Sequence, residues 1–526
     1  MLYTATALGG MITAPHHLAS EAGLRVLRDG GNAVEAMVAA AAAIAVVYPH
    51  MNAVGGDGFW LIAEPGRAPV GIDAAGWSAQ MATPDFYASQ GLDAIPARGP
   101  LAALNVAGTI AGWAKALELG GGELPLGRLL EDAIAHACDG VPVTRGQEDL
   151  SREKFEELKD VNGFAETYLP GGQPPAVNDV IKFPALAATL ERLADAGLDD
   201  FYRGETARAN AAYLESVGSP LRFEDFASFE ARQVTPLEVT LSSGTVYNMP
   251  PPTQGVSSLM ILALFERLGI TEADGFDHVH GLVEASKQAF LLRNAHVTDP
   301  AFMTADPNDW LKSQFLDGLA GNIDPETALD WPQPTKPGDT IWMGCIDADG
   351  RAVSFIQSVY WEFGSGVTNP ETGVLFQNRG NGFTLAPAHP NVLAPRKRPF
   401  HTLNPAMARL SDGRVLSYGT MGGEGQPQTQ AAVFSRYVSF GQPLQTAVTA
   451  PRWLLGRTWG EESTTLKLES RFDPALIDAL RAAGHNVDVM EPFTSIMGHA
   501  GAVCRHESGL IEGAADPRSD GRAAGF

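Results

Sequence analysis

The chain has 526 residues, of which 45% are hydrophobic and 19% are charged, and this composition is typical of a folded globular protein rather than a disordered one. Its formal net charge is −24. Because binding to nucleic acid or to an anionic membrane needs a basic surface, this charge argues against both kinds of partner.

The cellular location is predicted from features near the amino terminus and from the cysteines. The first residues contain neither the basic nor the apolar segment of a secretory signal. The longest apolar run, 36–47, is shorter than the ~20 residues that span a bilayer. The three cysteines are an odd number without CxxC spacing, which indicates a reducing compartment and no zinc site. We therefore expect a cytoplasmic protein.

The first part of the chain alternates helical and extended patterns. Of two helices expected at 20–27 and 32–47, the second is apolar nearly all round and should be central. Gly55-Gly56-Asp57-Gly58 then leads into a strand; because it lacks the Lys-Ser/Thr of a phosphate loop, we interpret it as a place of close backbone packing. The next expected elements are a strand at 70–74; helices at 110–119, 126–138, 145–160, 185–196 and 206–216; a hairpin of 237–241 and 245–248; and helices at 257–268 and 277–294.

The middle of the chain holds the stretch around which the function is argued. Segment 329–338 contains three prolines and no periodicity, which predicts an exposed, flexible leader. Two strands are expected next, up to 346 and from 351 to 360, joined by an Asp-Gly turn typical of a hairpin. Thr340 therefore opens a core strand directly behind a segment where a cleavable junction would be expected.

The remainder of the chain again combines helical and extended patterns. We expect strands at 373–377, 403–410 and 415–419, a helix from about 427 to 440, a strand at 466–468, a helix at 474–483, and short strands at 487–490 and 501–504. Sheets rich in hairpins with helices outside them indicate an α+β layered body without internal repeats.

Thr340 is a candidate nucleophile. If the chain is cut before it, its hydroxyl can attack while its own α-amine serves as the base. The unperturbed pKa of such an amine is about 8, so much of it can lose its proton near neutral pH. The plainer interpretation is a β-branched residue that opens an ordinary strand, and Thr340 taken alone favours it.

The other candidate site residues are informative only in combination with Thr340. Gly422-Gly423 lies between a strand and a helix, where backbone N–H groups can receive an oxyanion; a plain tight turn is the alternative. Ser358 lies on the return strand of the hairpin, within reach of the nucleophile. Arg379 offers a bidentate grip on a carboxylate, unless it is a surface arginine. His401-Thr402 precedes a strand, where structural capping and substrate contact both remain open. No histidine pair has HExxH spacing, so no metal site is expected.

Motifs along almost the whole chain resemble the γ-glutamyltransferase family of N-terminal nucleophile hydrolases, and they occur in the family's order. They are Val46 to Pro49, Gly55 to Phe59, Tyr202 to Gly204, Pro250 to Gly255, Glu284 to Lys287, Thr340 with Asp347 to Ser354, Phe363 to Gly366, Gly373 to Asn378 and Gly422-Gly423. The resemblance implies an α+β, four-layer αββα fold with two packed, antiparallel-rich sheets between helices.

The resemblance also implies a proenzyme that cleaves itself between Asp339 and Thr340. Its products would be 1–339 and 340–526, which together form one αββα body as a heterodimer of the chain's own fragments; further dimerisation stays open. Thr340 is then expected as the nucleophile that accepts the acyl group, Gly422 and Gly423 as the oxyanion hole, and Ser358 in place of the family's second threonine.

The sequence departs from the family where the amino acid of the substrate is held. The family's arginine for the glutamate α-carboxylate has no counterpart near Ala75-Gly76-Trp77, and an asparagine is replaced by Tyr360. The Gln-x-x-Asp clamp becomes Arg379 and Gly382, and the paired serines become His401-Thr402. We therefore expect a substrate that lacks an α-ammonium group and carries a carboxylate near the scissile bond.

Three segments, Arg98 to Leu101, Gly423 to Gln428 and Ala450 to Trp453, are similar to the oxamate amidohydrolase branch of the family. The resemblance implies hydrolysis of oxamate to oxalate and ammonia, in the cytosol, late in urate and allantoin breakdown, without a cofactor. Substrate contacts are expected from Arg379, His401, Thr402 and Tyr360. Three alternatives remain open: a γ-glutamyltransferase or hydrolase, an acylase for glutaryl (cephalosporin-type) amides, and a processed but inert binding protein.

Overall fold

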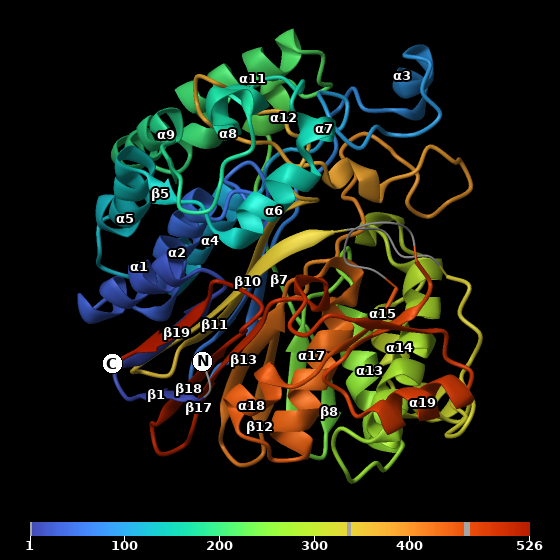
Figure 1. Ribbon diagram of the computed structural model, residues 1–526. Helices are drawn as coiled ribbons and strands as arrows, with labels where there is room; N and C mark the ends of the chain where they lie inside the picture. The colour runs from blue at the N-terminus through green and yellow to red at the C-terminus, as the bar shows by residue number, and fades with distance from the viewer. Residues whose placement is uncertain (1–2, 334–337, 457–462) are drawn as a thin grey trace.

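The computed structural model describes residues 3–333, 338–456 and 463–526 (Figure 1). Two seven-stranded sheets lie against each other, and helices cover their outer faces. Within the described residues no helix is long and apolar enough to cross a membrane.

The first sheet contains the predicted hairpin at its centre. Its strand order is β19 (Arg522–Gly525), β2 (Gly10–Ala14), β10 (Asp339–Asp347), β11 (Ala352–Tyr360), β3 (Asp57–Ala63), β4 (Val70–Ala74) and β7 (Arg232–Val234), all antiparallel. Strands from before and after residue 340 are therefore interleaved within one sheet, since β10 pairs with β2 on one side and β11 pairs with β3 on the other.

The second sheet is antiparallel as well. Its order is β1 (Ala5–Ala7), β18 (Ile511–Ala515), β17 (Ala500–Arg505), β13 (Val415–Thr420), β12 (Ala406–Leu410), β9 (Gly244–Asn248) and β8 (Leu237–Leu241). Apolar side chains of the two inner faces meet between the sheets, among them Phe59 and Trp342 from the first sheet and Met407 and Val503 from the second. Burial of this layer fixes the two sheets against each other.

Helices of the first outer face pack around α2 (Ala33–Val47), whose residues are all buried, as its apolar sequence predicts. Asn32 begins this helix with a capping box that it forms with Glu35. The other helices and small strands of this half are α1 (His17–Arg28), α3 (Pro84–Ser89), α4 (Thr109–Gly120), α5 (Leu126–Asp139), β5 (Val141–Pro142), α6 (Arg145–Glu153), α7 (Phe155–Leu158), α8 (Phe164–Tyr168), β6 (Val180–Ile181), α9 (Pro184–Ala196), α10 (Asp200–Arg203), α11 (Glu205–Ser216) and α12 (Phe223–Ala227).

The second outer face is covered mainly by α13 (Gly255–Arg267), α17 (Gln426–Phe434) and α18 (Leu444–Thr449) (Figure 1). Helix α14 (Phe276–His296) packs on α13 and α17. A three-stranded sheet flanks this layer. The remaining elements are α15 (Pro307–Trp310), α16 (Ser313–Ala320), β14 (Trp453–Leu455), β15 (Leu466–Glu469), α19 (Pro474–Ala482) and β16 (Val487–Met490).

Two expectations from the sequence are wrong. Segment 373–377 is not a strand, because its backbone forms only isolated bridges, from Leu375 to Thr368 and from Phe376 to Gly55. The leader 329–338 is not simply exposed, because both backbone groups of Leu329 bind buried side chains and Trp331 is only 8% exposed. Residues 334–337 of that leader lie outside the described residues.

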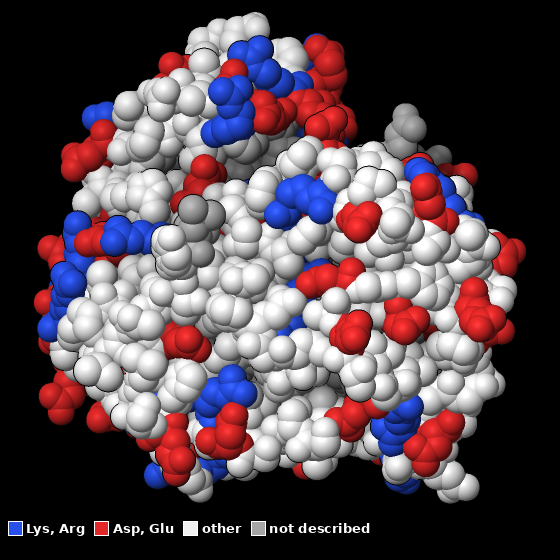
Figure 2. All heavy atoms as spheres, turned by 60° about the horizontal axis from the view of Figure 1, so that its bottom comes forward, with Lys and Arg blue, Asp and Glu red and all other residues white. Residues whose placement is uncertain are grey.

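The surface agrees with the charge of the chain. Figure 2 shows acidic side chains spread over one face, while basic side chains lie singly or in small groups among them. This face offers no continuous basic surface for a nucleic-acid backbone.

Candidate active site

Thr340 lies at an irregularity in the central hairpin. It is the second residue of β10 and is fully buried. In the ladder with β11, Asp339 pairs with Tyr360 and Ile341 pairs with Gln357. The single residue Thr340 therefore opposes two residues, Ser358 and Val359, which is the geometry of a β-bulge. The bulge takes Thr340 out of the regular ladder and places it across from Ser358.

The Gly422-Gly423 turn lies directly beside the segment that leads to Thr340. A Cβ atom added to Gly423 would lie 2.8 Å from the carbonyl oxygen of Gly338 and 3.2 Å from its Cα. Both glycines have positive φ values, 126° and 52°. Only glycine combines this conformation with so close an approach. The fold therefore brings the predicted oxyanion hole and the predicted nucleophile together.

Buried polar side chains that the sequence analysis did not single out fix this turn. Gln254 donates from Nε2 to the carbonyl oxygen of Gly423 at 2.9 Å and to that of Thr402 at 2.8 Å. Its Oε1 accepts from Nη1 of Arg293 at 2.7 Å, and Arg293 also forms an ion pair with Glu424. The runs Pro250 to Gly255, which contains Gln254, and Gly423 to Gln428, which contains Glu424, were the sequence signals for this support.

Arg379 forms the cationic centre of the site. It is fully buried, its guanidinium carbon lies 3.9 Å from the ring centroid of Tyr360, and Nη1 donates to Oγ1 of Thr402 at 3.2 Å. Its Nε and Nη2 atoms have no hydrogen-bond partner among the residues that the structure describes. Burial lowers the pKa of Arg379 only to about 10, so it is charged at neutral pH. A buried cation with unpaired N–H groups is unfavourable until an anion binds there.

His401 lies beside this cation and is tied to Asp57. Its Nε2 atom is 2.9 Å from Oδ2 of Asp57, whereas Nδ1 is buried and finds no partner within the described parts of the chain. Burial, together with the charge of Arg379, lowers the pKa of His401 well below 6.5, so the ring is neutral. Because one nitrogen of a neutral imidazole donates and the other accepts, the proton on Asp57 decides which role Nδ1 takes.

Asp57 is the functional candidate that sequence reasoning missed. The prediction of close backbone packing at its glycines holds, since a Cβ atom on Gly56 would lie 2.1 Å from the carbonyl oxygen of Ser358. The carboxylate accepts hydrogen bonds from the backbone N–H of Gly76 at 2.8 Å and from Nε2 of Gln377 at 2.9 Å. Burial nevertheless raises its pKa from 3.8 to about 7. An acidic residue among glycines at the start of an apolar strand was the available signal.

The raised pKa of Asp57 predicts a pH dependence of stability. The folded state binds a proton that the unfolded state releases between pH 3.8 and about 7. The free energy of unfolding should therefore fall, by up to about 4 kcal/mol, as the pH rises through this interval. We expect Asp57→Asn to flatten this slope in urea unfolding measured from pH 4 to pH 8. Parallel slopes for the two proteins would contradict the assignment.

Tyr360 links the cation to the hairpin. Its backbone has a φ of 85°, and its N–H donates to Oγ of Ser358 at 2.8 Å. The ring packs on Arg379, which in turn binds Thr402. The structure therefore places all four predicted substrate-binding residues in one buried group beside Ser358.

A cavity of about 360 Å³ lies beside the diglycine turn and the loop that carries Arg379, and its described lining contains none of the four predicted substrate-binding residues. Glu424, which follows the diglycine, and Gly382, from the loop that carries Arg379, are part of its wall. The full lining is Arg293, Asn294, Val297, Gly382, Thr384, His389, Asn391, Phe400 and Glu424. Its volume lies in the range of small-molecule sites.

The geometry has counterparts in known proteins. The family model described as Gamma-glutamyltranspeptidase matches residues 19–526. The chain belongs to this family. The predicted family membership is thus confirmed.

Relatives within the family include several differently named proenzymes. The chain is 54% identical over 521 residues to the oxamate amidohydrolase proenzyme of Klebsiella pneumoniae, and 40% identical over 521 residues to the glutathione hydrolase-like YwrD proenzyme of Bacillus subtilis. Each alignment covers 98% of both chains. The prediction that this family member is an amidohydrolase is confirmed at this level of similarity.

Solved structures confirm the predicted fold. Cephalosporin acylase from Bacillus halodurans superimposes with a TM-score of 0.92 at 32% identity, over 99% of this chain and 97% of that one. The Helicobacter pylori gamma-glutamyltranspeptidase reaches a TM-score of 0.56 at 27% identity, over 60% of this chain and 91% of that one. The αββα arrangement is therefore shared with acylases and transpeptidases alike.

Proposed function

We propose that the chain is a self-processing amidohydrolase that converts oxamate to oxalate and ammonia through an acyl-enzyme on Thr340. The observation that carries this proposal is the buried guanidinium of Arg379, whose Nε and Nη2 lack partners among the described residues and which lies in the same group as Ser358 and Tyr360. The 54% identity to an oxamate amidohydrolase proenzyme supports it.

Maturation is the first step. The Thr340 hydroxyl attacks the carbonyl carbon of Asp339, the peptide bond gives way to an ester, and water hydrolyses that ester. The products are a carboxylate on residue 339 and an amine on residue 340. The contact between Gly338 and Gly423 supports this step, because it brings the peptide next to the turn that can receive its oxyanion.

Turnover uses the same atoms. Arg379 binds the carboxylate of oxamate, and the N–H groups of Gly422 and Gly423 receive the developing oxyanion. The Thr340 hydroxyl attacks the amide carbon while the α-amine takes its proton and passes it to the leaving ammonia. Water then hydrolyses the oxalyl ester and restores the hydroxyl.

The charge in this site explains why γ-glutamyl substrates are the weaker alternative. Their α-ammonium group would have to lie near the buried, charged Arg379, and like charges repel strongly in a poorly solvated site. An oxamate carboxylate instead receives two charge-assisted hydrogen bonds in a fork geometry. A protonated Asp57 would add a third donor, since it bonds to Nε2 of His401 and leaves the proton on Nδ1.

This role of Asp57 predicts a pH-dependent KM. Above about pH 7 the ionised carboxylate offsets the charge of Arg379, so the KM for oxamate should rise by about tenfold between pH 6 and pH 8. In Asp57→Asn, which cannot ionise, we expect no comparable rise. Steady-state assays of the two matured proteins across this range measure the difference, and identical KM profiles would rule out the role.

A second candidate function is an acylase for glutaryl amides. The TM-score of 0.92 to a cephalosporin acylase favours it. Two assays distinguish the oxamate amidohydrolase from the glutaryl acylase. One measures ammonia release from oxamate, malonamate and succinamate, and the other measures aniline release from a glutaryl anilide. We expect oxamate to have the highest kcat/KM. Cleavage of the anilide without turnover of oxamate would reverse the assignment, and an N-acylated glycylglycine formed with added glycylglycine would show transfer.

The place of the enzyme in the cell follows from the same proposal. An amidohydrolase for oxamate would act in the cytoplasm, late in urate and allantoin breakdown.

A further inference from the structure

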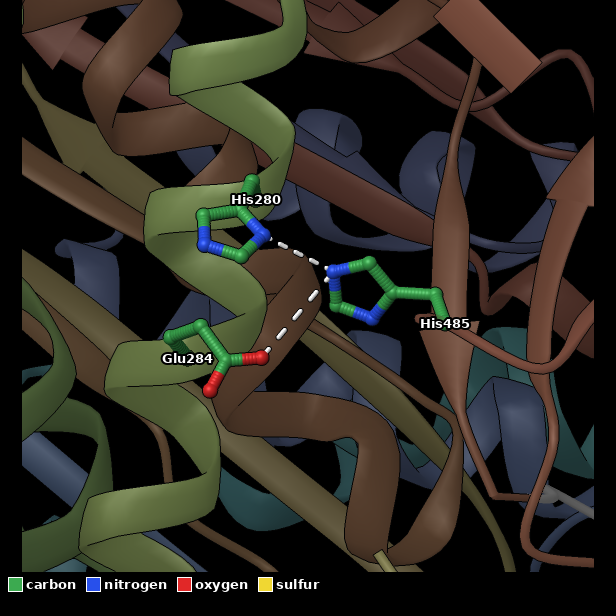
Figure 3. A group of neighbouring side chains, drawn as sticks. All are labelled: His280, Glu284 and His485. Atoms are coloured by element: carbon green, nitrogen blue, oxygen red, sulfur yellow. Dashed lines mark hydrogen bonds and ion pairs between the residues drawn. The ribbon is translucent and has the colours of Figure 1, made fainter. Parts of the chain in front are cut away.

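A second buried polar cluster lies away from the active site. Figure 3 shows His280 and Glu284 one turn apart on α14, with His485 facing both from the turn between α19 and β16. Nδ1 of His280 is 2.9 Å from Nε2 of His485, and Oε1 of Glu284 is 3.9 Å from that same Nε2. Lys287, one further turn along α14, completes the cluster, and all four side chains are at most 6% exposed.

The composition of the cluster is that of a zinc site, but its electrostatics are not. Lys287 places its ammonium 2.7 Å from Oε1 of Glu284, the oxygen that faces His485. A metal ion between the three ligands would lie close to this ammonium and be repelled by it. The ammonium group of Lys287 therefore already supplies the positive charge that a metal ion would bring to this cluster.

The hydrogen bonds of His280 and His485 can also be explained without a metal ion. His280 directs Nε2 to the carbonyl oxygen of Asp324 at 2.9 Å, so this nitrogen must carry the proton. Its Nδ1 is then an acceptor, and Nε2 of His485 donates to it. Burial lowers the pKa of His485 to about 3, in agreement with a neutral ring.

The cluster binds the backbone of the segment that leads toward residue 340. Lys287 donates to the carbonyl oxygen of Leu329 at 2.5 Å, and the N–H of Leu329 donates to Oε2 of Glu284 at 3.1 Å. The N–H of Ala328 donates to the carbonyl oxygen of Ala483 at 2.8 Å. Segment 324–329 is therefore held directly by α14 from before residue 340 and by Ala483 from after it, while His485 contacts the α14 side chains His280 and Glu284.

These contacts fix one end of a short connection whose other end is also fixed. Leu329 is bound by the cluster, and Gly338 lies against Gly423 of the diglycine turn. In the sequence, the two attachment points are separated only by residues 330–337. Attachment on both sides restrains the backbone at Gly338 and favours torsion angles that aim the carbonyl carbon of Asp339 at the Thr340 hydroxyl.

We propose that His280, Glu284, Lys287 and His485 form a clasp that positions the leader for self-cleavage and afterwards keeps the carboxyl-terminal end of the first fragment bound to the second. This inference rests on the proposed self-processing at Thr340. The four side chains are positioning residues, because none of them contacts the reacting atoms.

Two sets of variants test the clasp. His485→Leu removes the donor to His280, while His485→Gln keeps an N–H donor at a similar reach. Glu284→Leu combined with Lys287→Met removes both hydrogen bonds to Leu329 without leaving a buried charge unpaired. Lys312→Met makes the same lysine change in an exposed pair with Asp309 and serves as the matched control.

The readouts are the half-time for loss of the full-length band in purified wild-type and variant proteins, and the kcat/KM of each matured protein for oxamate. We expect His485→Leu and the double variant to lengthen the half-time at least about tenfold while kcat/KM stays within about twofold. His485→Gln should restore most of the rate, and Lys312→Met should match the wild type.

Other outcomes overturn the inference. Equal half-times for wild type and variants, or an equal loss of processing, kcat/KM and melting temperature, would mean that the cluster is merely structural. A stoichiometric metal in the purified protein would mean that it is a metal site. A wild-type chain that never divides would defeat the proposed function itself, whereas a dividing wild type with unaffected variants would defeat only the clasp.

Discussion

Thr340→Ala leaves the chain in one piece and without amidohydrolase activity. The substitution removes the hydroxyl that is expected to attack both the Asp339 carbonyl and the substrate, so a denaturing gel should show a single full-length band. Ammonia release from oxamate should fall by at least about 10³-fold, the scale seen when a nucleophile is removed. Timed gels and an ammonia assay measure the two effects on the same preparation.

Thr340→Ser is the matched control for this experiment. It keeps a hydroxyl and, once cleaved, an α-amine, so we expect two fragments and measurable turnover at a reduced rate. Two bands from Thr340→Ala, or full activity in an uncut chain, would refute the assignment of the nucleophile.

Arg379→Gln is expected to have the next largest effect. It removes the cation and its fork of donors from a fully buried position. Loss of charge-assisted hydrogen bonds costs about 3 kcal/mol or more, which corresponds to a fall of at least about 100-fold in kcat/KM for oxamate. The measurement is steady-state kinetics on fully cleaved protein, with acetamide as a neutral amide of similar size.

Matched variants separate charge from geometry at this position. Arg379→Lys keeps the charge but not the fork, so its kcat/KM should lie between those of the wild type and Arg379→Gln. Thr402→Val removes only the partner of Nη1 and should have a smaller effect. An unchanged kcat/KM for oxamate in Arg379→Gln would exclude this residue as the carboxylate contact.

The sequence predicts those elements whose signals are local. The capped, wholly apolar helix α2, the Asp-Gly hairpin of β10 and β11, and the hairpin of β8 and β9 all occur within a few residues of their expected bounds. Strands β2 and β19 were not predicted. Their sequences, GMITA and RAAG, have no polar and apolar alternation, and they become strands because they pair with each other across almost the full length of the chain.

The same difference between local and long-range signals applies to the candidate site. Thr340, Ser358 and the diglycine could be proposed from the sequence because each lies in a motif or at the end of a strand. Asp57 and Gln254 were not found, because their importance comes from remote partners: Asp57 binds His401 over a separation of 344 residues. A buried polar residue has no periodic signature, and only the fold shows which group satisfies it.

The interleaving of strands in the first sheet has a consequence for refolding of the enzyme after cleavage. Strand β2 lies between β19 and β10, and β3 lies beside β11, so severing the chain before residue 340 leaves two polypeptides woven into a single ladder. An uncut chain folds by a unimolecular reaction, but a cut one that has lost its structure must find its other half in solution, at a rate set by concentration. The proposed cleavage would thus turn refolding from a unimolecular reaction into a bimolecular one that slows on dilution.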